Sequence, residues 1–129
     1  MIITCSYPYG VIIGNLRKWK KIGVVACNSC ARACETGGKE AMTKLVERLR
    51  TDGFEVVGEH VVPMACNIDL AKKPDYQADV VIMLGCNSAL NTFKELFPKI
   101  KIIPGLITVG IGARDNKGGL YVMKSFLKK

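Results

Sequence analysis

The stretch from Ile22 to Gly53, IGVVACNSCARACETGGKEAMTKLVERLRTDG, decides the fold. Its first part, Ile22 to Ala26, is a short apolar and partly β-branched run, which is typical of a buried strand. Its last part, Lys39 to Thr51, has apolar residues at the i, i+3, i+4, i+7 spacing of an amphipathic helix, and Gly53 follows as a helix stop. The residues that set this spacing are Met42, Leu45, Val46 and Leu49. The stretch therefore predicts a strand, a cysteine-rich loop and a helix.

The same alternation continues along the chain. Phe54 to Val62 is a second β-rich segment, and Asp79 to Leu84 is a third, almost wholly apolar strand. A fourth strand fits either Ile100 to Ile103 or Leu106 to Val109. Short strands alternating with helices are typical of a parallel sheet covered on both faces.

Two helical or ambiguous segments complete the pattern. Ser88 is a plausible N-cap for a helix that Pro98 ends. The tail, Arg114 to Lys129, turns at Gly118-Gly119 and then fits an edge strand or a short helix equally well. At 129 residues the chain has the length of one domain. We expect a single cysteine-rich α/β domain over residues 1–129, with a small Rossmann-like or flavodoxin-like parallel sheet and helices on both faces.

Composition bears on location and partners. No apolar run reaches the roughly 18 residues of a membrane helix, and the N-terminus lacks the features of a signal peptide, so we expect a cytoplasmic protein without membrane contact. The net charge is +8, but the Lys and Arg residues are spread along the chain. Tyr7, Tyr9 and Trp19 lie near the basic segment Arg17 to Lys21, yet no recognised nucleic-acid motif surrounds them. We expect no nucleic-acid partner, and the charge can solvate helix faces or meet an acidic partner.

Six cysteines are the most informative feature. A reducing cytosol keeps thiols free, so metal binding or redox chemistry is favoured over disulfides. Cys27, Cys66 and Cys86 each come directly or shortly after a predicted strand, and the carboxyl ends of parallel strands meet at one edge of a sheet. Cys30 and Cys34 follow Cys27 in a C-x2-C-x3-C spacing. The topology therefore predicts five thiols at one sheet edge.

Such a loop can hold three corners of a cubane, with the fourth supplied by Cys66 or Cys86, which gives the four thiolates that a [4Fe–4S] cluster usually takes. One of the five is then spare or has a second role. Thr36-Gly37-Gly38 would bring backbone N–H groups close to the negatively charged cluster. Four thiolates also suit tetrahedral zinc, so a zinc site is the alternative cofactor.

The remaining candidates have ordinary interpretations. Cys5 precedes any strand end and is expected to be structural, and His60 lies inside a predicted strand as a structural or surface histidine. The sequence has no P-loop, no G-x-G-x-x-G after the first strand and no evident set of nucleophile, histidine and acid. A thiol redox enzyme that uses Cys27 and Cys30 is a third hypothesis.

The run from Val24 to Gly38, together with Cys66-Asn67-Ile68-Asp69 and Leu84-Gly85-Cys86-Asn87, resembles the small cysteine-rich subunit or C-terminal domain associated with methylenetetrahydrofolate reductase in acetogens and related anaerobes. The likeness covers roughly residues 1 to 110. Within it, five cysteines match the family's pattern and Cys5 does not; the matching residues are Cys27, Cys30, Cys34, Cys66 and Cys86. Family members are usually longer, and some carry C-terminal cysteines that this chain lacks.

The resemblance implies a partner, namely a flavin-bearing barrel subunit that performs the folate chemistry while the small subunit contributes an iron–sulfur or zinc site. We therefore expect an iron–sulfur accessory or electron-transfer subunit of a methylenetetrahydrofolate-reductase-type oxidoreductase complex, which would not be catalytic by itself. The alternative is a zinc-stabilised structural or assembly module for a flavoprotein partner.

Overall fold

The computed structural model describes residues 1–16 and 21–127. Residues 17–20 and 128–129 lie outside this description, and with them Trp19, most of the basic segment that begins at Arg17, and the last two lysines.

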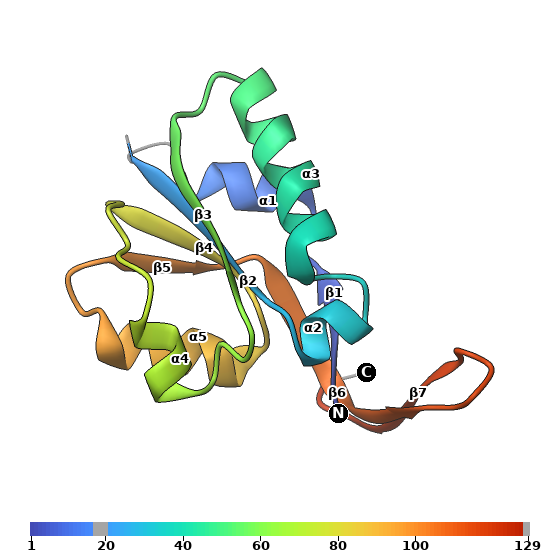
Figure 1. Cartoon of the computed structure of the whole chain (residues 1–129). Coiled ribbons are helices and arrows are strands. Elements are labelled where there is room, and N and C mark those ends of the chain that lie inside the picture. Colours follow the sequence, from blue (N-terminus) through green and yellow to red (C-terminus); the bar gives the residue numbers. More distant parts are fainter. Residues whose placement is uncertain (17–20, 128–129) are drawn as a thin grey trace.

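A four-stranded parallel sheet forms the centre of the fold (Figure 1). Its strands are β2 (Ile22–Cys27), β3 (Val56–Val62), β4 (Val80–Leu84) and β5 (Lys101–Pro104), in the order β3-β2-β4-β5. All three pairings between neighbours are parallel. The predicted α/β class and the predicted parallel strands are thus confirmed, each within a few residues of the expected bounds.

Helices pack on the two faces of this sheet. Figure 1 shows α1 (Tyr9–Gly14) and α3 (Gly38–Thr51) on one side, with α4 (Ile68–Lys72) and α5 (Asn87–Leu96) on the other. Every residue of β2 and of β4 is buried, because these two central strands are covered from both sides. This explains why both strands read as continuous apolar runs in the sequence.

The helix boundaries follow local signals, with one exception. Helix α3 ends as expected before Gly53, whose φ of +91° is readily adopted by glycine. The prediction that Ser88 caps the next helix is wrong, since α5 begins at Asn87 and its N-cap is Cys86. The helix starts earlier because the chain turns directly out of β4 through Gly85.

A second, antiparallel sheet was not predicted. Its strands are β1 (Ile2–Ser6), β6 (Leu106–Arg114) and β7 (Leu120–Ser125), in the order β1-β6-β7. The two alternatives for the fourth strand are both strands: one is β5 of the parallel sheet, and the other lies in β6. Within the ambiguous tail, residues Leu120 to Ser125 form β7, so this part is a strand rather than a helix.

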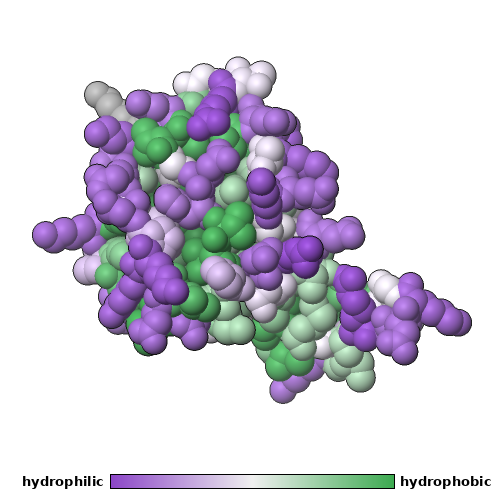
Figure 2. All heavy atoms as spheres, in the orientation of Figure 1, coloured by the Kyte–Doolittle hydropathy of each residue, from purple (hydrophilic) through white to green (hydrophobic). Residues whose placement is uncertain are grey.

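Strand β7 and the end of β6 project from the body as a hairpin (Figure 1). All six residues of β7 are exposed, and apolar side chains are visible on this projecting part in the space-filling view (Figure 2). No helix within residues 1–16 and 21–127 combines the length and the apolar character needed to cross a bilayer.

Candidate functional site

Three cysteines lie at the carboxyl edge of the parallel sheet, at or shortly after the ends of three neighbouring strands. Cys27 is the last residue of β2 and is paired with Val62, the last residue of β3. Ala26 is paired with Leu84 at the end of β4, and Cys86 follows shortly after it. Cys66 comes from the loop that follows β3. The strand order β3-β2-β4 therefore brings Cys27, Cys66 and Cys86 to one edge, with Cys27 on the middle strand.

The loop after β3 and the loop after β4 both pass close to Cys27. The backbone N–H of Ala65, in the loop after β3, donates a hydrogen bond of 3.5 Å to the Cys27 sulfur. On the other side, a Cβ at Gly85 would lie 3.5 Å from the Cys27 Cβ and 2.9 Å from the Ala89 Cβ. Glycine at position 85 thus allows the chain after β4 to pass beside Cys27 before it delivers Cys86.

Cys66 is electrostatically coupled to three other cysteines. The pKa of the Cys66 thiol is raised, mainly because the thiol is partly desolvated. The nearby charges of Cys86 and Cys27, and to a smaller extent that of Cys30, raise it further. A single thiolate at Cys66 is therefore disfavoured by its neighbours when no cation is present. A metal centre would supply the positive charge that allows several thiolates to share this edge.

Cys30 and Cys34 come from the short helix α2 (Cys30–Ala33) and the residue that follows it. Cys30 is close enough to affect the thiol of Cys66. Cys34 instead donates a hydrogen bond of 3.6 Å to the backbone carbonyl of Ile2, which belongs to β1 of the antiparallel sheet. Cys34 thus differs from Cys27, Cys30 and Cys86: those three affect the pKa of Cys66, whereas Cys34 contacts the other sheet.

The loop that carries Cys66 is anchored at its α4 end by two interactions that the sequence predictions did not include. The Asn67 side chain caps α4 by accepting a hydrogen bond of 3.1 Å from the N–H of Leu70. The Thr92 hydroxyl of α5 donates a hydrogen bond of 3.4 Å to the carbonyl of Cys66. An asparagine directly before Ile68-Asp69-Leu70 is a helix N-cap signal, so this anchor could have been found from the sequence.

The cysteine thiols at this edge are ligands that suit a metal ion or an iron–sulfur cluster. They do not, however, converge on one point in this structure. Among residues 1–16 and 21–127, no group of three or more His, Cys, Asp or Glu side chains is arranged to hold a metal ion. All six cysteines are free thiols. Binding therefore requires the loops that carry Cys30, Cys66 and Cys86 to close toward Cys27.

The other two candidates lie elsewhere. Cys5 is an exposed residue of β1, so it fills no place in the core. His60, in β3, stacks edge-on against Tyr76 with ring centroids 5.0 Å apart. This contact is a packing interaction, as expected for a structural histidine.

Comparisons of the chain with models of protein families, with curated proteins and with solved structures give no match.

Proposed function

We propose that Cys27, Cys30, Cys66 and Cys86 bind a [4Fe–4S] cluster and that the chain acts as an electron-transfer or accessory subunit. The observation that carries the proposal is the position of three cysteines at or shortly after the ends of three neighbouring parallel strands. Cys30, on α2, is added because it affects the pKa of Cys66. A cluster bound there would carry single electrons. Zinc bound by the same four thiolates is the alternative, in which case the chain is a structural or assembly module.

The residues around the four thiols have defined roles in this proposal. The backbone N–H of Ala65 already donates to the Cys27 sulfur, and such N–H···S bonds stabilise thiolate ligands and tune a cluster's potential. The hydrogen bond between Thr92 and the Cys66 carbonyl fixes the loop that presents Cys66. Cys34 is the spare cysteine in this proposal, because its thiol donates a hydrogen bond to the backbone carbonyl of Ile2.

The strand order supports a more specific fold assignment. Numbered within the parallel sheet alone, β3-β2-β4-β5 is the order 2-1-3-4, which is the first part of the flavodoxin-like order 2-1-3-4-5. We therefore propose a small doubly wound fold of this kind, to which the chain adds an antiparallel sheet. Ligand groups in such folds gather beyond the carboxyl ends of the strands, where the cysteines lie.

The partner in this proposal is a flavin-bearing subunit of a methylenetetrahydrofolate-reductase-type complex in the cytoplasm. Support for it comes from the five-cysteine pattern followed by Gly37-Gly38, which resembles that of the small subunit in this family. Free thiols that bind iron also require a reducing compartment.

Anaerobic purification followed by iron, sulfide and zinc analysis tests the cofactor. We expect about four irons and four sulfides per chain and a broad visible absorbance that is lost on reduction. Cys30→Ser and Cys66→Ser should lose the iron, whereas the matched variants Cys34→Ser and Cys5→Ser should retain it. Equal iron in all four variants would contradict the assignment. Colourless protein with about one zinc per chain would establish the zinc alternative.

The same loaded protein tests the accessory role. It is assayed for methylenetetrahydrofolate reduction with a chemical electron donor, first alone and then with candidate flavoproteins. We expect no turnover by the chain alone. Turnover without a flavoprotein would make the chain an enzyme in its own right.

A further inference from the structure

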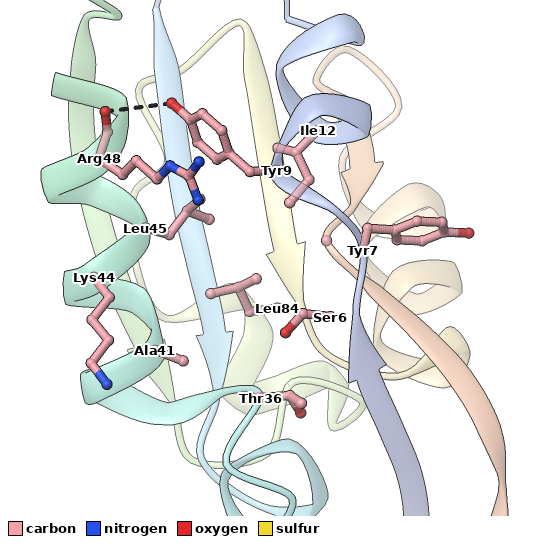
Figure 3. Close-up of a pocket in the computed structure, with 11 residues that line it drawn as sticks. Ser6, Tyr7, Tyr9, Ile12, Thr36, Ala41, Lys44, Leu45, Arg48 and Leu84 are labelled. Carbon is pink, nitrogen blue, oxygen red and sulfur yellow. Dashed lines mark hydrogen bonds between the residues drawn. The ribbon is translucent and has the colours of Figure 1, made fainter. Parts of the chain in front are cut away.

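A cleft on the other side of the cysteine loop is a second distinctive feature. It lies between α3 and the segment formed by β1 and α1, on the face of the parallel sheet that these elements cover (Figure 3). An inner part of 230 Å³ and an outer part of 910 Å³ share three lining residues, Ser6, Ala41 and Lys44. Small-molecule sites have volumes of roughly 300–1,000 Å³, so the two parts together are large enough for such a ligand.

The inner part is mostly apolar and is closed at one end by a fixed aromatic ring. Figure 3 shows Ile12, Leu45 and Leu84 lining it, with Tyr9 at the end nearest Arg48. The Tyr9 hydroxyl donates a hydrogen bond of 2.6 Å to Asp52, and the Arg48 guanidinium lies 3.8 Å from the centre of the Tyr9 ring. An apolar slot beside a rigid aromatic ring is suited to a planar ring of a ligand.

The outer part carries a surplus of positive charge. Four cationic and two acidic side chains line it, namely Arg32, Lys39, Lys44, Arg114, Glu35 and Glu40. Within residues 1–16 and 21–127 the one ion pair is that of Arg50 with Glu59, so none of these four cations is paired with a carboxylate there. Arg114 donates to the backbone carbonyl of Ala33 instead. The unpaired cations favour an anionic group in the outer part.

The position of the cleft in the sheet is consistent with ligand binding. Asn28, directly after β2, and Leu84, at the end of β4, belong to its lining. From β2 the chain continues to its neighbour β3 on one side of the sheet, and from β4 it continues to β5 on the other side. The strand order therefore reverses between β2 and β4, and the cleft lies at this point. In open α/β sheets this is the place where ligands bind. The N-terminus of α3, whose N-cap Gly37 supplies no side-chain cap, also lines the outer part and adds free N–H donors.

We propose that this cleft binds a phosphorylated aromatic compound of mononucleotide size, with its ring in the inner part beside Tyr9 and its phosphate in the outer part near Lys44 and Arg32. The combination of an apolar slot and an adjoining cationic mouth carries this assignment. No cysteine lines either part, so the site is distinct from the four thiols. The two sites flank the same segment, since α2 carries Cys30 toward Cys66 and Arg32 toward the cleft.

Isothermal titration calorimetry of the full chain with AMP and with FMN tests the proposal. The comparison compounds are adenosine and riboflavin, which lack the phosphate, and ribose 5-phosphate and inorganic phosphate, which lack the ring. We expect AMP or FMN to bind at least about ten-fold more tightly than both kinds of truncated compound, because each part of the cleft contributes separately. Failure of both nucleotides to bind at millimolar concentration would overturn the proposal. Equal binding of the ring-free phosphates would reduce the site to an unspecific anion site and would overturn it too.

Variants locate the binding. Lys44→Ala should weaken the binding nucleotide about ten-fold or more, because it removes a cation that lines both parts. Lys72→Ala, at the end of α4 on the opposite face of the sheet, makes the same change in net charge and should leave binding unaltered. Equal weakening by both variants would contradict the site. Ala41→Phe should block the cleft, and Lys44→Ala remains decisive if this variant does not fold.

The cysteine proposal and the cleft proposal fail separately. Cys66→Ser should abolish iron binding and leave nucleotide affinity within about two-fold, since Cys66 does not line the cleft. Loss of nucleotide binding in Cys66→Ser together with normal binding in Lys44→Ala would place the ligand at the thiols instead and would refute the cleft site.

Discussion

Strand β4 at the centre of the parallel sheet and strand β7 of the β6–β7 hairpin are both rich in apolar residues, but they differ completely in burial. Each residue of β4, Val80 to Leu84, is buried, whereas each residue of β7, Leu120 to Ser125, is exposed. The difference arises because helices cover the parallel sheet on both faces and no element covers β7 within the described residues (Figure 1). Apolar composition therefore does not by itself produce a core; the surrounding elements must exclude water.

This contrast implies an uneven distribution of stability. Burial of apolar side chains is the main stabilising contribution in folding, so most of the free energy of unfolding should come from the parallel sheet and its helices. A two-stranded ribbon is marginally stable alone. The hairpin should accordingly open locally at a much lower free energy than the body.

The largest effect is expected in the body, from Phe93→Ala. Phe93, on α5, is fully buried, and its ring contacts those of Tyr76 and Phe97 at centroid distances of 5.4 Å in both cases. Truncation of a buried phenylalanine leaves a cavity and costs about 3–5 kcal/mol. Urea unfolding followed by circular dichroism measures this loss. A decrease in the free energy of unfolding of less than about 1 kcal/mol would show that packing in the body is not the main source of stability.

The parallel sheet could be predicted from the sequence more fully than the antiparallel sheet. Strands β2 and β4 and helix α3 have signals in their own residues, such as the buried run Ile22 to Cys27, so their positions were predicted well. The antiparallel sheet depends on pairing between residues far apart, as in Ile2 with Ile111. No local pattern indicates which distant strand a short apolar segment will join, so this sheet was missed.

The candidate site divides in the same way. The edge on which Cys27, Cys66 and Cys86 lie follows from the rule that parallel strands end together, and it could be predicted without coordinates. The orientation of Cys34 could not, because its hydrogen-bond partner is the carbonyl of Ile2 in the unpredicted sheet. Spacing alone thus identifies which thiols are near one another but does not determine which way each one points.

An intermediate, pH-dependent effect is expected for Tyr76, which packs against Phe93 in the body. Burial raises its pKa from 10.0 to about 12, and its hydroxyl donates a hydrogen bond of 2.9 Å to the Ala71 carbonyl. The folded state therefore holds the phenol proton more tightly than the unfolded state does. The resulting stabilisation is complete below pH 10 and is lost as the pH rises from about 10 to 12.

Tyr76→Phe should lower stability at neutral pH by about 0.5–1.5 kcal/mol, the usual net contribution of one hydrogen bond, and should weaken the alkaline loss. Part of that loss should remain, because the pKa of Tyr9 is also raised to about 12, first by burial and then by its hydrogen bond to Asp52. Tyr121→Phe is the matched control on the hairpin, where the hydroxyl is bonded to Asp115 at 2.7 Å but the residue is exposed. Unfolding curves between pH 7 and 12 measure both variants. An unchanged alkaline slope in Tyr76→Phe would show that its proton is not linked to folding.

The smallest effect is expected on the hairpin, from Met123→Ala. Met123 lies in the middle of β7 and is 73% exposed, so little apolar surface leaves water when the chain folds. Surface substitutions of this kind usually change stability by less than about 0.5 kcal/mol, and the urea midpoint should remain close to that of the unmodified chain. Native-state hydrogen exchange gives an independent measurement, in which the β7 amides should exchange through local opening while those of β4 exchange only on global unfolding. A loss of stability comparable to that of Phe93→Ala, or protection of β7 equal to that of β4, would show that the hairpin and the parallel sheet form one cooperative unit.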